Sequence, residues 1–249
     1  MGFLRRRDYA AGELSVGHGW RYSDSPLLTY SIGMNGAAFR RNADGVIETA
    51  EFQPTTTIQT RGRHSWTLSF PYRYEDLNQG FSLPGGASVA AGVYHFTAAR
   101  LQYRAPQSAL VRPGLTIEAG QFYDGRQASI SFSPQWSPNM HLGLGGGYSL
   151  DYVDFADRSE SVTAHVARFR AEVMVSATTS AVGFVQYNST QDAVIANLRF
   201  HYNPREGNDL YIVWNEGLVT DRHSFDPVPP FSSERTLLVK YSHTLQRVL

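Results

Sequence analysis

The stretch "RQASISFSPQW", residues 126–136, alternates apolar and small polar side chains almost without interruption. The apolar parity contains Ala128, Ile130, Phe132, Pro134 and Trp136. The other parity contains Ser129, Ser131, Ser133 and Gln135. Successive side chains of a β-strand point to opposite sides of the sheet. The stretch therefore predicts a strand with one apolar face and one polar face.

The same period of two recurs along the whole chain, whereas the helical period of 3.6 is almost absent. We count about 13 such segments, many of about 10 to 14 residues, which is longer than the strands of most soluble sheets. Residues 164–177 also fit a helix, because they are rich in Ala, Arg, Glu and Met. Their second half alternates like the neighbouring segments, so we expect a strand there too.

Composition excludes several classes of protein. The 249 residues carry no net charge, which argues against a nucleic-acid partner, and they contain no cysteine for disulfides or thiolate sites. No apolar run approaches the roughly 18 residues of a membrane-spanning helix. The first residues, "MGFLRRRDYAAGEL", lack the apolar core of a signal peptide.

The length of the segments and their aromatic ends favour a membrane. A tilted strand needs about 9–11 residues to cross a bilayer, and rings gather at the two headgroup levels. The aromatic residues that end the apolar faces are Trp20, Tyr22, Tyr72, Trp136, Tyr152, Tyr202 and Tyr241. The longest predicted loops all fall among the even-numbered connections, as in outer-membrane barrels.

We therefore predict an all-β fold, an antiparallel transmembrane β-barrel of about 12–16 strands with 14 as the best estimate. Residues 1–249 are expected to form a single domain. Bacterial barrels have even strand counts, so the 13 visible segments suggest the C-terminal part of a longer protein. A soluble barrel or sandwich with the faces exchanged would show the same alternation, and stays as the alternative.

The densest group of charges on the predicted polar face is the candidate site. It comprises Arg168, Arg170, Glu172, Arg199, His201 and Lys240. In a barrel lumen such a group would form a constriction that favours anions. The alternative is an ion-pair lattice that fills the lumen. Gly143, Gly145 and Gly147 of "GLGGGY", residues 143–148, share the polar parity and are expected to let side chains from across the barrel pack close.

We predict no catalytic residue, metal or cofactor. The acidic series Asp151, Asp154, Asp157 and Glu160 lacks the pattern of a calcium loop and fits a solvated connection. Ser161 and His165 share a parity, but four residues along a strand is about 13 Å, which is too far for a nucleophile and its base.

Four stretches together resemble an uncharacterised bacterial family. They are "GFLRRRDY", "GQFYDGRQASISFSPQWSPNMHLGLGGGY", "FVQYNSTQDAVIANLRFHYNPREGNDLYIVWNEGL" and "RTLLVKYSHTL", and the most specific part is residues 197–217. In that family a C-terminal domain of unknown function, expected to be an outer-membrane β-barrel, commonly follows a periplasmic domain similar to family-nine carbohydrate-binding modules. We expect neither that domain nor a signal peptide within these 249 residues, which end in "LQRVL" rather than in an aromatic residue; Leu245 or Leu249 would have to serve instead.

The resemblance implies a bacterial outer-membrane location, with the lipid bilayer and the barrel-assembly machinery as partners. The predicted function is a pore, or a barrel that handles solutes in association with carbohydrate recognition, with carbohydrate or another small solute as a partner. Two alternatives stay open: a plugged barrel that only anchors a periplasmic binding domain, and a soluble β-barrel binding protein.

Overall fold

A computed structural model describes residues 8–222, 227–228 and 230–244. The expectations for "GFLRRR", residues 2–7, and for Leu245 and Leu249 concern residues outside these ranges. The only helical elements in the described ranges are two 3₁₀ turns, Pro84–Gly86 and Ala156–Arg158. None of the described helices is long and apolar enough to cross a membrane.

The described residues form a 16-stranded antiparallel sheet and a separate two-stranded ribbon, which confirms the all-β antiparallel prediction. The strands of the sheet are β1 (Tyr9–Arg21), β2 (Leu27–Arg41), β3 (Ile47–Thr60), β4 (Ser65–Ser69), β5 (Tyr72–Leu77), β8 (Gly92–Arg104), β9 (Val111–Arg112), β10 (Gly114–Phe122), β11 (Gly125–Phe132), β12 (Gln135–Asn139), β13 (Leu142–Phe155), β14 (Glu160–Ser176), β15 (Thr179–Asn188), β16 (Ala193–Arg205), β17 (Asn208–Val219) and β18 (Ser232–His243). The ribbon pairs β6 (Phe81–Ser82) with β7 (Ser88–Val89).

Thirteen of these strands form one continuous path of paired neighbours, close to the count from the sequence. β5, β9 and β12 lie off the path, each separated by a short gap from the strand before or after it in the chain. Each of the three gaps contains a proline, namely Pro71, Pro113 and Pro134. Proline has no N–H to donate to the ladder, so it interrupts a strand.

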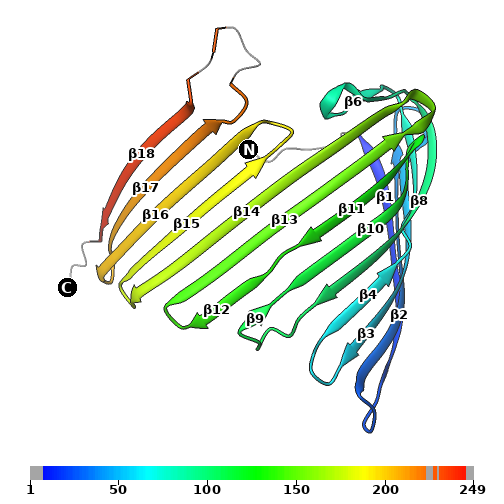
Figure 1. Cartoon of the computed structure of the whole chain (residues 1–249). Helices are drawn as coiled ribbons and strands as arrows, with labels where there is room; N and C mark the ends of the chain where they lie inside the picture. Colours follow the sequence, from blue (N-terminus) through cyan, green and yellow to red (C-terminus); the bar gives the residue numbers. More distant parts are fainter. Residues whose placement is uncertain (1–7, 223–226, 229, 245–249) are drawn as a thin grey trace. The chain divides into compact units, whose positions relative to one another are not determined.

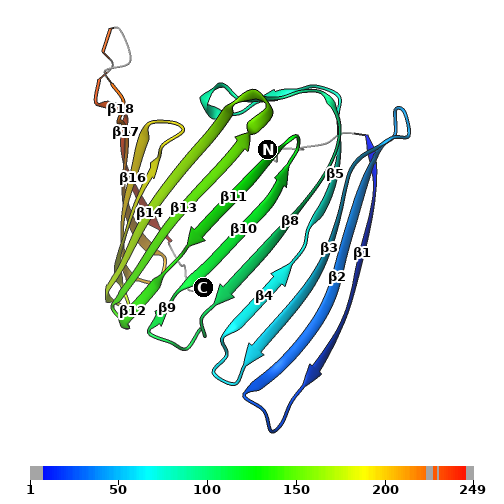
Figure 2. The ribbon, with the colours of Figure 1, turned by 45° about the vertical axis from the view of Figure 1, so that its right-hand side comes forward.

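The chain forms two compact units. Unit 1 comprises residues 1–107, 114–131 and 151–163, and its strands follow the order β1-β2-β3-β4-β8-β10-β11 (Figure 2). β5 continues the line of β4, because both pair with β3 and β8 in the same register: Ser69 faces Thr55 and Arg100, and Tyr72 faces Phe52 and Thr97.

Unit 2 comprises residues 108–113, 132–150 and 164–249, of which the described part holds β15 to β18 in chain order, side by side (Figure 1). Residues 164–176 belong to β14, which confirms the strand and excludes the helix. The antiparallel registers run almost unbroken, for example from Val166–Asn188 to Met174–Ser180 between β14 and β15. The single-domain expectation stays a prediction.

Few large apolar side chains are buried. The apolar residues that the structure buries are Ala87, Val89, Phe96, Ala98, Ala105, Phe155 and Val162. Four of them, Ala87, Val89, Phe155 and Val162, form one cluster in unit 1. Most other large apolar side chains are exposed.

Candidate functional site

The two faces of unit 1 differ sharply in chemistry. On one face a cross-strand row is aromatic and apolar from end to end. The registers align Trp20, Tyr30, Ile58, Trp66, Tyr103 and Leu115 across six neighbouring strands. The rings of Trp20 and Tyr30 stack at 5.5 Å, and those of Trp66 and Tyr103 lie 4.4 Å apart.

A second aromatic level lies further along the same face. Tyr72 hydrogen-bonds His95 at 2.7 Å, and the ring of Tyr74 lies 5.0 Å from that of His95. His95 is eight residues from Tyr103 on β8, about 26 Å along the strand. Leu68, Leu101 and other apolar side chains fill the interval between the two aromatic levels.

The opposite face of unit 1 is polar. One cross-strand row on it consists of Gly19, Ser31, Thr57, Thr67, Gln102 and Thr116. Within this row the hydroxyls of Thr57 and Thr67 share a hydrogen bond of 3.0 Å. The alternation that the sequence shows is therefore the alternation of two sheet faces, as predicted.

A lattice of charges crosses this polar face near its middle. Glu118 is only 8% exposed and is held by three partners. Arg100 donates to Oε2 at 2.6 Å, Gln127 donates to Oε1 at 3.0 Å, and Arg73 lies 3.5 Å from Oε1. Arg73 also pairs with Glu51 at 3.5 Å. The lattice compensates the buried carboxylate, which would otherwise be costly.

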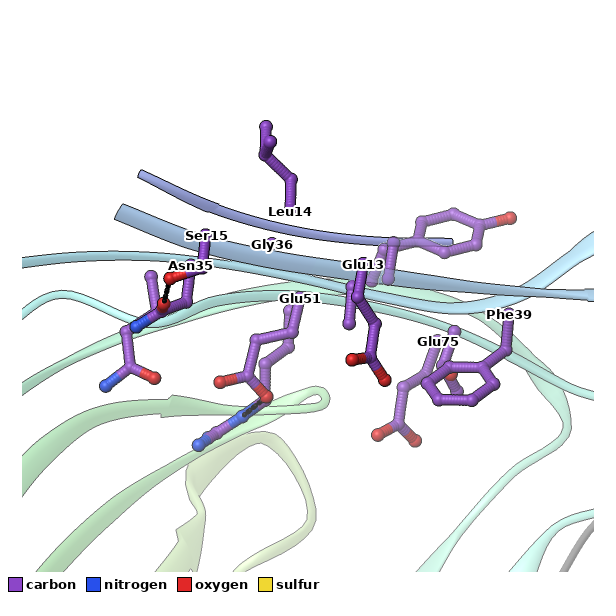
Figure 3. Close-up of a pocket in the computed structure, with 14 residues that line it drawn as sticks. Glu13, Leu14, Ser15, Asn35, Gly36, Phe39, Glu51 and Glu75 are labelled. Carbon is purple, nitrogen blue, oxygen red and sulfur yellow. Dashed lines mark hydrogen bonds and ion pairs between the residues drawn. The ribbon is translucent and has the colours of Figure 1, made fainter. Parts of the chain in front are cut away.

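A hollow of about 580 Å³ lies beside this lattice on the polar face. Figure 3 shows Glu13, Glu51 and Glu75 pointing to one side of the strands, and Leu14 pointing to the other. Ser15 and Asn35 border the hollow and share a hydrogen bond of 2.8 Å. A second hollow, of about 310 Å³, shares Arg73 and Glu75 with the first. The two hollows on the polar face therefore meet at Arg73 and Glu75.

Unit 2 places all six predicted site residues on its polar face, but not as one cluster. Arg168, Arg170 and Glu172 form a column on β14, and Arg170 Nε donates to Glu172 Oε1 at 3.1 Å. Arg199 on β16 faces Val182 and Val213 in the neighbouring strands. The uncharged strand β15 thus separates the column on β14 from Arg199 on β16, which sequence parity alone does not reveal.

His201 belongs to a separate group in unit 2. Its Nε2 contacts Asp209 Oδ1 at 2.8 Å, and its ring stacks on Tyr211 at 4.3 Å. Asp209 also accepts a hydrogen bond from Asn203 at 2.8 Å. Lys240 faces Tyr211 across β17 and β18. These contacts make His201 part of a local network rather than of the arginine column.

Gly143, Gly145 and Gly147 lie beside the charged column of β14, so the side chains nearest to them come from the adjacent strand, whereas side chains from across the barrel were expected. A Cβ added to Gly147 would lie 3.6 Å from Arg168 Cβ and 3.9 Å from its Nε. Gly143 and Gly145 stand in the same relation to Glu172 and Arg170. The space is taken by the adjacent strand β14, whose arginine stem lies over the glycine backbone.

The lattice around Glu118 was not predicted from the sequence. Arg100 and Glu118 both had the polar parity, but their strands are joined through the long connection at residues 105–113. Arg73 follows Pro71, where the alternation is hard to read across the gap. The lattice could have been predicted from oppositely charged residues at polar-face positions of consecutive strands.

Metal ligands and a catalytic pair were not expected. Within the described ranges no group of three or more His, Asp or Glu side chains is arranged to hold a metal ion. His165 Nδ1 forms a hydrogen bond of 2.8 Å with the hydroxyl of Tyr148.

Comparison of the sequence with models of known protein families gives no match, and comparison with curated proteins gives none either. The function must therefore be argued from the two faces.

Proposed function

We propose that the chain forms the wall of a β-barrel in the outer membrane of a Gram-negative bacterium, through which small polar solutes pass. One observation carries the proposal: the face that bears the large apolar side chains is exposed, and aromatic rows bound it. Soluble monomers rarely expose contiguous apolar patches larger than a few hundred Å². A lipid environment removes that cost.

The polar face supports a water-filled lumen on the inner side of such a wall. It bears hydroxyls, amides and a compensated charge lattice, and it carries hollows of about 580 and 310 Å³. Since no backbone group can stay unpaired in hydrocarbon, the sheet edges must be covered by closure of the barrel. The charged columns at Arg168, Arg170 and Arg199 would then bias passage toward anions.

A second candidate is a plugged barrel that anchors a binding domain in the membrane. The observation that favours it is the segment between β5 and β8, which packs over the polar face of unit 1. The resemblance to barrels that follow carbohydrate-binding modules makes carbohydrate the first solute class to test for either candidate.

The experiment is reconstitution of the purified chain into phosphatidylcholine liposomes, followed by planar-bilayer recording and sugar-swelling assays. We expect extraction that depends on detergent, protease-protected strands and ion conductance. Insertion without conductance would favour the anchor. A monodisperse protein that is soluble without detergent would refute the membrane proposal and favour the soluble binding protein.

A further inference from the structure

The connection between β5 and β8, residues 78–91, contributes Ala87 and Val89 to the buried apolar cluster of unit 1, although most of its other residues are exposed. Val89 and Phe155 are each only 1% exposed, and Ala87 is buried with them. Partly buried side chains surround this cluster, namely Leu77, Leu83, Tyr94, Phe122, Tyr123 and Val153. In Figure 1 the segment with β6 leaves the line of the strands and curls back.

The side chains that receive the segment lie on the polar face. Leu77 follows Arg73 and Glu75 on β5 in steps of two residues, and Phe122 follows Glu118 on β10 in the same way. Side chains two residues apart in a strand share a face. The segment therefore folds over the polar face at the end of the strands, where that face becomes apolar.

The segment is built to hold one compact shape. Phe81 pairs with Val89 in the β6–β7 ribbon, and Leu83 N–H donates to the Ala87 carbonyl at 2.7 Å. Its turn uses Gly85 and Gly86 at φ values of 82° and 93°, a conformation that other residues rarely adopt.

A neighbouring connection fastens the segment. The guanidinium of Arg158 donates to the Ser88 carbonyl at 2.9 Å and lies 4.4 Å above the ring of Phe155. The same group forms ion pairs with Asp124 and with Glu160, the latter at 3.3 Å. A side chain with so many partners holds the segment in place rather than letting it swing as a lid.

The smaller hollow, about 310 Å³, opens next to this packed region. Its walls include Phe96, Phe122 and Tyr123 from the aromatic side, and Glu118 and Asp151 from the charged side. Phe122 and Tyr123 thus contact both the cluster that holds the segment and the hollow beside the charge lattice, whereas no residue of the segment itself lines the hollow.

We propose that residues 78–91 form a fixed constriction that sets the size limit for solutes on the polar face of unit 1, with Arg158 as its fastener. The proposal rests on the proposed function, because it requires the polar face to line a water-filled path. The segment would act as a sieve: solutes wider than the opening beside Phe122 and Tyr123 would be excluded whatever their charge.

The first test removes the segment without disturbing the strands. Leu77 and Gly92 face each other in the β5–β8 register, so an Asn–Gly turn can join them directly in place of residues 78–91. In liposome swelling with a series of sugars and polyethylene glycols, we expect the size limit to shift to larger solutes. Single-channel conductance should rise in the same variant.

The second test loosens the segment while leaving it in the chain. Arg158→Gln removes the ion pairs, and we expect chymotrypsin to cut after Phe81 about tenfold faster in proteoliposomes, as the loss of charge-assisted hydrogen bonds implies. Arg126→Gln is the matched control, since Arg126 is exposed and lies in the same unit. Chymotrypsin should cleave the control at the same rate as the original protein, and the two proteins should conduct equally.

The outcomes separate this inference from the proposed function. If the original protein neither inserts nor conducts, and the deletion variant does not conduct either, both the constriction and the proposed pore function are overturned. An original protein that is silent and a deletion variant that conducts support the constriction in its most closed form. A conducting original protein whose size limit is unchanged by the deletion overturns the constriction and leaves the pore intact.

Discussion

Replacement of Leu198 by arginine tests whether the apolar face of the sheet contacts lipid or water. Leu198 lies on β16 between Gly183 and Trp214, and it is 51% exposed. Tyr202, four residues along, is about 13 Å away on the strand and about 10 Å in height at a tilt of about 40°. Because half the hydrocarbon thickness is about 15 Å, Leu198 would lie near the midplane when Tyr202 is at the headgroups.

The expected cost follows from that depth. Arginine on the lipid face at the midplane costs about 2–4 kcal/mol, whereas a half-exposed leucine in water tolerates arginine within about 0.5 kcal/mol. The matched control is Asn197→Arg, one residue away on the polar face. It loses the hydrogen bond between Asn197 and Asn215, worth about 1 kcal/mol, but meets no hydrocarbon.

The assay is a reversible urea titration of folding into phosphatidylcholine bilayers, followed by tryptophan fluorescence and by heat-modifiable migration on gels. We expect Leu198→Arg to lose clearly more folding free energy than Asn197→Arg. Equal losses, or a negligible loss at Leu198, would refute the assignment of the apolar face to lipid.

Three further predictions test the polar face. Glu118→Ala leaves Arg73 and Arg100 without their shared carboxylate, and we expect a loss of about 3–5 kcal/mol in the same titration, with a loss under about 1 kcal/mol contradicting the lattice. Burial and the bond to Glu75 raise the pKa of the Tyr123 phenol, so its stabilisation is complete below the unfolded pKa of about 10 and is lost as pH rises further; the difference in stability between the original protein and Tyr123→Phe should shrink above that pH and be constant below it. If the lumen conducts, reversal potentials should show a weak anion preference that falls with salt and with Arg199→Ala, and a cation preference would contradict the electrostatic argument.

Much of the fold was predictable because the period of a strand is a local property. Trp20, Trp66 and Tyr103 lie on one face of the sheet, as the alternation in the sequence indicates. The pairings of their strands run without a register shift, so the alternation is kept from one strand to the next. The strand at residues 164–176 was ambiguous by propensity alone. The neighbouring strands favour a strand there, because a helix at these residues would leave β15 without a pairing partner along one edge.

The candidate site was predictable only in part, because charge contacts depend on which strands are neighbours. Arg170 and Glu172 pair within one strand, so their spacing in the sequence suffices. Arg199 and Lys240 share the predicted face, yet the intervening strands keep them apart from that pair. Glu118 meets Arg73 across β8, a contact between positions 45 residues apart that no local pattern encodes.

The sequence contains an indication that residues 78–91 fold over the polar face, but the alternation of apolar and polar residues alone does not reveal it. Phe122 and Phe155 have the polar parity of their strands, where an aromatic side chain would stand in water at a substantial cost unless something covered it. Each lies at the end of its strand, and the Gly- and Pro-containing stretch "QGFSLPGG", residues 79–86, supplies Ala87 and Val89 directly after its turn. Apolar residues on the wrong parity at strand ends, together with a long connection that carries its own apolar residues, thus point to a segment folded over the polar face. Close packing also explains two glycines: a Cβ at Gly80 would lie 2.6 Å from the backbone oxygen of Val89 within this segment, and a Cβ at Gly125 would lie 2.6 Å from that of Asp154 on β13.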